Sequence, residues 1–191
     1  MRDSYLADAL AFLVTTVFDL YILVVMLRFL FQWVRADFYN PVSQFVVQLT
    51  NPPLRFLRRF VPGLGGVDLA ALVLMLALKF LERWVVLGIQ GVGAGPAAAL
   101  VLAVADLVDL AISVFMVSVL VQVLLSWVAP NTYNPAVGLI RDLNAPLNRV
   151  ARRILPPVSG WDLSPILILV VLQLASLLVV APVRDLGRSL L

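Results

Sequence analysis

Four stretches of the chain are almost continuously apolar: about 8–34, 68–90, 98–128 and 163–183. A helix needs about 20 mostly apolar residues to cross the hydrocarbon core of a bilayer, and each stretch meets that length. Leu, Val, Ile and Ala occur around the whole circumference of each predicted helix, as in helices surrounded by lipid. The pattern therefore predicts an all-α membrane protein with four transmembrane helices.

Two segments between these spans, 35–67 and 129–162, have a different pattern. In the first, apolar residues recur at the i, i+3, i+4 and i+7 positions of a helix, which predicts an amphipathic helix lying on the membrane surface. The residues of this apolar stripe are Val42, Phe45, Val46 and Leu49. Pro52 and Pro53 are expected to end this helix, and Asn51 is expected to cap a second short helix.

The two segments are copies of each other. Residues 33–69 align with 127–163 without a gap at an offset of 94, and 14 of the 37 positions are identical. The identical positions include residues that cap, start or stop helices: Asn40, Pro41, Pro52, Pro62 and Asp68 in the first copy, and Asn134, Pro135, Pro146, Pro156 and Asp162 in the second. Such residue types fix backbone geometry, so the match indicates an internal duplication.

The duplication divides the chain into a first repeat (1–90), a linker (91–97) and a second repeat (98–191). Each repeat consists of a span, an amphipathic segment and a span. Because each has two spans, the copies are expected to be parallel, related by an axis along the membrane normal.

Composition excludes a soluble domain. Apolar residues make up 62% of the chain and charged residues 13%, against about 45–50% and about 25% in ordinary globular proteins. The N-terminal apolar stretch exceeds the roughly 7–15 residues of a signal peptide's apolar region, so we expect a retained span. The sequence has no Cys and no His. Thiol and imidazole chemistry and Cys/His metal sites are thereby excluded, and we expect no cofactor.

Arginine placement predicts the topology. The repeat segments contain eight of the 13 Arg residues: Arg35, Arg55, Arg58, Arg59, Arg141, Arg149, Arg152 and Arg153. The opposite side has Arg2, Arg184 and Arg188. The positive-inside rule therefore places the repeat segments in the cytoplasm and both termini outside. The net charge of +3 favours contact with anionic lipid rather than nucleic acid.

The first candidate site consists of the two arginine triplets, Arg55, Arg58, Arg59 and Arg149, Arg152, Arg153. They can bind anionic lipid or a membrane or cytoplasmic protein partner, each contributing about 1 kcal/mol at an anionic leaflet. The alternative is that they only set topology and anchor the interfacial helices.

The second candidate site is a set of charges within the first repeat: Asp19, Lys79, Glu82 and Arg83. Counted from the repeat-segment side, Asp19 is level with Glu82 and Arg83 on the neighbouring antiparallel helix. The equivalent residues of the second repeat are uncharged. Charges inside a span are costly unless paired, so the set is either a paired cluster lining a polar cavity or a structural salt bridge near the outer interface.

Other polar residues in the spans have simpler interpretations. Asp106 and Asp109 lie near the start of the third span, where the helix dipole favours anions. Arg28 is close enough to the repeat-segment side to extend its guanidinium to the interface. Trp33 and Trp127 occupy matching interfacial positions typical of aromatic anchors.

The order Tyr-Asn-Pro, an amphipathic run, Asn-Pro-Pro-Leu, Arg-Arg and a Gly-x-Asp-Leu opening the next span resembles the YggT family of small bacterial membrane proteins. The resemblance covers both repeats. It implies a non-enzymatic inner-membrane protein linked to osmotic or extracytoplasmic stress and ion homeostasis. Relatives in plastids and cyanobacteria imply an alternative role as a scaffold for division, nucleoid distribution or cytochrome assembly. A third hypothesis is a small ion channel or transporter that uses the charges of the first repeat.

Overall fold

A computed structural model describes residues 2–91, 93, 95–128, 134–157 and 162–191. Apart from one isolated bridge in a turn, the regular structure in these residues is helical. The elements are α1 (Arg2–Val34), α2 (Pro41–Leu57), α3 (Leu69–Ile89), α4 (Pro96–Val128), α5 (Pro135–Ile154), α6 (Ser164–Ala175), the π-helical turn η1 (Ser176–Val180) and α7 (Ala181–Ser189). The expected all-α class is confirmed.

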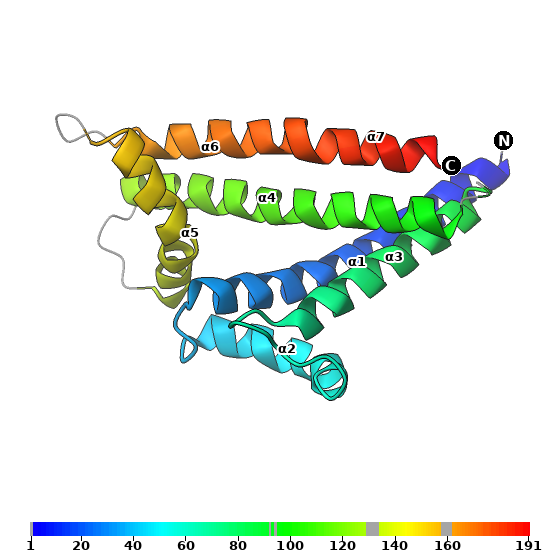
Figure 1. Cartoon of the computed structure of the whole chain (residues 1–191), viewed down its shortest axis with the longest axis horizontal. Helices are drawn as coiled ribbons and strands as arrows, with labels where there is room; N and C mark the ends of the chain where they lie inside the picture. Colours follow the sequence, from blue (N-terminus) through cyan, green and yellow to red (C-terminus); the bar gives the residue numbers. More distant parts are fainter. Residues whose placement is uncertain (1, 92, 94, 129–133, 158–161) are drawn as a thin grey trace.

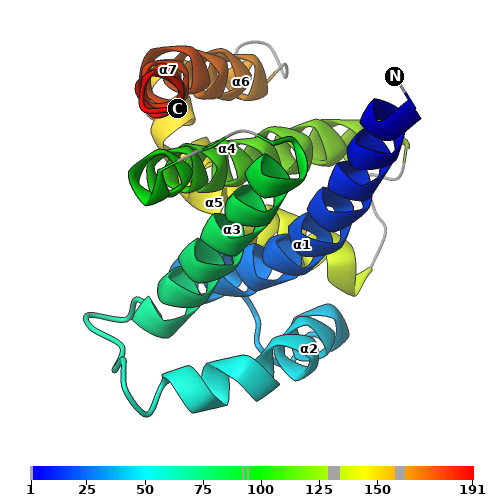
Figure 2. The ribbon, with the colours of Figure 1, turned by 90° about the vertical axis from the view of Figure 1, so that its right-hand side faces the viewer.

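The long helices form two antiparallel pairs, one from each repeat. α1 packs along α3, and α4 packs along the continuous helix made of α6, η1 and α7 (Figures 1 and 2). Both termini lie at one end of the molecule, and α5 lies across the opposite end (Figure 1). The two repeats meet along α3 and α4 and where α5 touches α1.

Three helices are long and apolar enough to cross a membrane: Tyr5–Val34, Pro96–Val128 and Ser164–Ser189. α3 also has 21 residues, but its second half contains Lys79, Glu82 and Arg83. Because of these three charges, α3 is not among the helices that are apolar enough to cross a membrane by composition alone. That α3 is a fourth span therefore stays a prediction.

Small residues let the helices approach closely. Ala70 and Ala71 at the start of α3 are fully buried and belong to the same apolar core as Ile22 and Val25 of α1. On α7, a β-carbon added at Gly187 would lie 2.8 Å from the side chain of Leu102 on α4. Close backbone contact of this kind replaces the hydrophobic driving force that helices lack inside lipid.

Asn40 and Asn134 begin the amphipathic helices as N-caps: their side chains accept hydrogen bonds from the amides of Val42 and Ala136, and Pro41 and Pro135 follow as first helical residues. The expected break at Pro52 is wrong. α2 continues through Pro52 and Pro53, and α5 continues through Pro146. An internal proline removes one helical hydrogen bond but bends a helix without ending it when the flanking turns are held by packing. Figure 2 shows the bend of α2.

Asn51 is therefore not a helix cap. It lies inside α2, and its side-chain oxygen accepts a hydrogen bond from Arg28 Nη1 at 2.9 Å. Thr50 accepts from the same nitrogen at 2.7 Å. The second repeat has an uncharged version of this contact, in which Asn144 donates to Gln122 at 2.8 Å. Each repeat thus ties its first long helix to its amphipathic helix through a polar contact.

An ion pair links the end of each amphipathic helix to the beginning of the next long helix. Arg58 pairs with Asp68, which is also the N-cap of α3, and Arg152 pairs with Asp162 at 2.7 Å. Asp162 also accepts from the amide of Ser164, although Leu163 is the N-cap residue of α6. Pro62 and Pro156 lie between the paired residues. Both members of the pair are identical in the two repeats because they perform the same connection.

The carboxyl group of Asp162 is affected by two opposing influences. Burial would raise its pKa, but hydrogen bonds from Ser164 and Arg152, together with the charge of Arg152, lower the pKa below its usual value. Its ionised form is therefore bound more strongly in the folded state than in the unfolded chain.

We predict that Asp162→Asn lowers stability at pH 7 by about 1 kcal/mol or less, the usual value of an exposed ion pair. A depressed pKa contributes stability above the unfolded value, about 3.9, and this contribution is lost as the pH falls through the folded pKa. The difference between wild type and variant should therefore shrink below about pH 4. Thermal unfolding in detergent at several pH values measures it. A difference that stays constant with pH would contradict the assignment.

Candidate functional site

Lys79 is the centre of a buried charge cluster between α1 and α3. Its Nζ donates to Asp19 Oδ1 at 2.6 Å and to the two carboxylate oxygens of Glu82 at 3.0 and 2.8 Å. Glu82 is fully buried and Lys79 is 5% exposed, whereas the Asp19 side chain is 45% exposed. One ammonium group therefore balances an inner and an outer carboxylate.

Arg83 does not join this contact, although its depth along α3 is level with Asp19. It instead pairs with Asp106 on α4. Depth counting placed Asp19 level with Arg83, which is one helical turn from Lys79 on the same helix. The structure assigns Lys79 to Asp19 and makes Arg83 a link between the two repeats.

Asp106 and Asp109 belong to the same polar region. Arg184 on α7 donates to Asp106 at 3.0 Å and to Asp109 at 3.1 Å, and Ser176 donates to Asp109 at 2.9 Å. The interpretation of these aspartates as partners of the helix dipole is wrong. They lie about three turns inside α4, which begins at Pro96, and the dipole effect fades within the first turn.

Ser176 and Arg184 lie on either side of the start of α7, close to Pro182, which cannot donate a helical hydrogen bond. The residues before this proline, Ser176–Val180, form a π-helical turn. A π-turn inserts an extra residue into the helical register and is frequent at functional sites. Here it lies where both polar side chains reach α4.

These charges line one cavity of about 560 Å³ that is bounded by α1, α3, α4 and α7. Its charged lining residues are Asp19, Lys79, Arg83, Asp106, Asp109 and Arg184. With the buried Glu82, four carboxylates face three basic groups, which leaves one excess negative charge. A cavity with this balance can hold a small cation or a proton.

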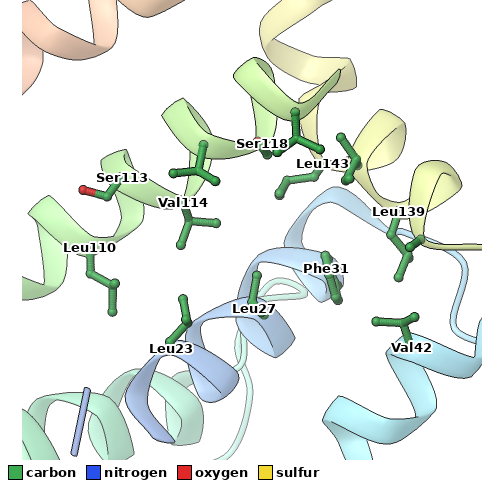
Figure 3. Close-up of a pocket in the computed structure, with 14 residues that line it drawn as sticks. Leu23, Leu27, Phe31, Val42, Leu110, Ser113, Val114, Ser118, Leu139 and Leu143 are labelled. Atoms are coloured by element: carbon green, nitrogen blue, oxygen red, sulfur yellow. The ribbon is translucent and has the colours of Figure 1, made fainter. Parts of the chain in front are cut away.

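An apolar pocket of about 420 Å³ adjoins the charged cavity on the side of the repeat segments. It lies between α1 and α4 and reaches α5, with Leu27 and Phe31 facing Val114 and Leu139 (Figure 3). Leu23, Leu110 and Ser113 line both spaces. The space between the two repeats is thus charged near the termini and apolar near the amphipathic helices.

The arginine triplets are exposed at the ends of α2 and α5. They divide into two kinds. Arg58 and Arg152 are held by Asp68 and Asp162, whereas the other four form no salt bridge with a described residue: Arg55, Arg59, Arg149 and Arg153. The structure therefore leaves two arginines of each triplet available to a lipid or partner.

Sequence reasoning missed Arg184 as a site residue, and it treated Arg28 as extending to the interface. Arg28 is instead only 6% exposed. The signal for Arg184 was available: it is 20 residues from the start of α6 at Ser164, and Asp109 is 19 residues from the end of α4. Counting depth in the second repeat as in the first would have placed the two at the same level.

Comparison with known proteins agrees with the duplicated fold. The model of the CCB3/YggT family matches twice, over residues 7–89 and 101–183. An uncharacterised protein of Pseudomonas aeruginosa is 41% identical over 177 residues, covering 92% of this chain and 90% of its own. The YggT protein of Escherichia coli K12, also uncharacterised, is 34% identical over 184 residues, covering 96% of each chain. No solved structure matches the chain. The protein therefore belongs to the CCB3/YggT family.

Proposed function

We propose that the chain is a non-enzymatic protein of the bacterial inner membrane that crosses it four times and supports ion homeostasis under osmotic or extracytoplasmic stress. α3 is the fourth span in this proposal, because it lies antiparallel along α1 and all three of its charges form salt bridges within the protein. α2 and α5 lie on the cytoplasmic surface, and both termini lie outside, as the distribution of arginine favours.

The charged cavity carries the proposal. Ionisable side chains inside membrane-spanning segments mark ion paths or proton relays unless they only stabilise the fold. Here the side chains line an open cavity, and the partly exposed carboxylates of Asp19 and Asp109 border it. The charged groups of the cavity together carry one excess negative charge. The cavity therefore binds a monovalent cation or a proton from the outer side.

The apolar pocket lies on the path that such an ion would follow from the cavity toward the cytoplasm. Between the cavity and the cytoplasmic surface the space is lined by side chains such as Val114 and Val117. Apolar constrictions stop ions by excluding water. In this proposal the resting protein is closed, and flux requires the two repeats to separate along α1 and α4.

The exposed arginines support a second candidate function as a membrane-surface scaffold. Arg55 and Arg59 occur beside the exposed aromatic rings of Phe56 and Phe60, at the end of α2 and in the turn that follows it. Basic and aromatic groups together bind the headgroup region of anionic membranes. Such a surface can recruit a partner for division or cytochrome assembly without any ion movement.

Cation flux into proteoliposomes tests the first candidate. We expect Asp109→Asn to reduce the flux by about tenfold or more, because one charge in a medium of low dielectric constant contributes several kcal/mol. The Arg184–Asp106 pair stays intact in this variant. Arg59→Gln, at the far end of the molecule, is the control. Equal flux in wild type, Asp109→Asn and empty vesicles would favour the scaffold.

Val114→Ser tests the apolar section separately. A hydroxyl group at this position admits water to the constriction, so we expect the resting flux to rise above that of wild type. The measurement uses the same vesicles. Unchanged flux would show that the apolar pocket is not on an ion path.

Labelling of single cysteines tests the topology, because the native chain has none. We predict that a membrane-impermeant maleimide labels Gly93→Cys and Ser189→Cys in intact spheroplasts, but labels Arg59→Cys only after permeabilisation. Labelling of Arg59→Cys and Gly93→Cys from the same side would mean that α3 does not cross the membrane.

A further inference from the structure

Arg28 is a buried cation without an anionic partner among the described residues. It is 6% exposed, and its Nη1 donates to three neutral acceptors: Val47 O at 3.1 Å, Thr50 Oγ1 at 2.7 Å and Asn51 Oδ1 at 2.9 Å. Its Nε and Nη2 donate to no described residue. Lys and Arg are almost never buried unless they are paired, and a buried charge that lacks compensation is expensive.

Two cavities adjoin at this guanidinium, at the end of the molecule opposite the charged cavity. One of about 160 Å³ is also lined by Arg35, and one of about 530 Å³ is also lined by Arg58 and Asp68. Gln32 and Phe38 line both, as Arg28 does. Three guanidinium groups thus face one carboxylate, and that carboxylate is already paired with Arg58.

The backbone of Arg35 gives an independent indication. Arg35 follows the last residue of α1 with a φ of 57°, in the left-handed region, and the amide of Ala36 donates back to Phe31 O. Glycine is the usual residue at this position of a helix end, because any side chain adds strain there. Strained residues of this kind cluster at ligand sites. A strained residue that places a guanidinium on the pocket wall fits this pattern.

The second repeat provides an internal comparison. Gln122 and Ala129 stand where the first repeat has Arg28 and Arg35. Gln122 is satisfied by the side-chain amides of Asn144 and Asn148 at 2.8 and 3.3 Å. The contact between the first long helix and the amphipathic helix therefore forms without an arginine at this position, so folding alone does not explain Arg28.

We propose that the pocket between α1, α2 and the turn before α3 binds a phosphate group, held by Arg28 and Arg35 with Arg58 at its rim. The planar guanidinium matches two phosphate oxygens, and three arginines against one aspartate leave two positive charges to be balanced. The group belongs either to the headgroup of an anionic phospholipid or to a soluble phosphate. The site shares no residue with the charged cavity and does not depend on its proposed role.

Thermal unfolding of the purified full-length protein in neutral detergent tests the proposal, followed by the fluorescence of its four Trp residues. The two probes are inorganic phosphate and short-chain phosphatidylglycerol, each titrated to obtain a Kd from the stabilisation. We expect saturable binding of at least one probe. Binding of both probes would show that a phosphate group alone is enough for binding. Binding of the phospholipid alone would show that the site needs a lipid headgroup.

Variants decide whether binding occurs in this pocket. Arg28→Gln introduces the residue of the second repeat and should weaken binding about tenfold or more, the value of a lost hydrogen bond to a charged group. Arg35→Gly should also weaken binding while the unliganded protein keeps or raises its unfolding temperature, because the backbone strain is relieved.

Arg141→Gln is the matched control, since it removes an equal charge from an exposed position of α5 that lies outside the pocket and outside the arginine triplets. It should leave the Kd nearly unchanged. The proposal is wrong if neither probe binds saturably, or if Arg141→Gln weakens binding as much as Arg28→Gln does.

Discussion

Asp106 is the carboxylate on which the joining of the two repeats depends. It accepts from Arg83 of the first repeat and from Arg184 of the second, so one buried side chain of α4 holds α3 and α7 at once. Arg83 pairs with no other described carboxylate. Arg184 also pairs with Asp109, but Asp109 does not reach Arg83. In an apolar surrounding, removal of one partner from such a group leaves charges whose desolvation is no longer compensated. This neutralisation therefore helps to hold α3 and α7 against α4 around the charged cavity.

The duplicated sequence explains the parts that the repeats share and not the parts that join them. The Arg58–Asp68 and Arg152–Asp162 pairs, the N-caps Asn40 and Asn134 and the polar contact at residues 28 and 122 occur twice because each repeat must connect the same three helices. Residues at the contact between repeats have no such requirement. They differ between the copies: Arg83, which pairs with Asp106 across this contact, has Leu177 as its equivalent in the second repeat.

The sequence predicts a large part of this fold for clear physical reasons. Long apolar segments have few alternatives to helix, and the offset of 94 residues predicts where the pattern recurs. Depth counting brought Asp19 to the level of the charges on α3, but it selected Arg83 where the contact is Lys79. Depth gives the height of a residue along a helix and not the direction in which its side chain points. The path of α2 through Pro52 was missed because local rules cannot show that packing will hold a bent helix.

The two ends of the molecule carry excess charge of opposite sign, and the two excess charges favour the same orientation of the protein in the membrane. The pocket at the amphipathic helices has three guanidinium groups for one carboxylate, whereas the cavity near the termini has one carboxylate in excess. In the orientation proposed above, the basic end faces an anionic cytoplasmic leaflet, and the negative excess at the other end favours cations entering from outside. The apolar pocket between them is a barrier to ion passage, because an ion that crossed it would lose its hydration without gaining a partner. A phosphate bound at Arg28 would reduce the positive excess at the cytoplasmic end and lower the barrier that this end presents to a cation. If both sites function as proposed, occupancy of the phosphate pocket affects cation movement through charge, in addition to the separation of α1 and α4 that flux requires.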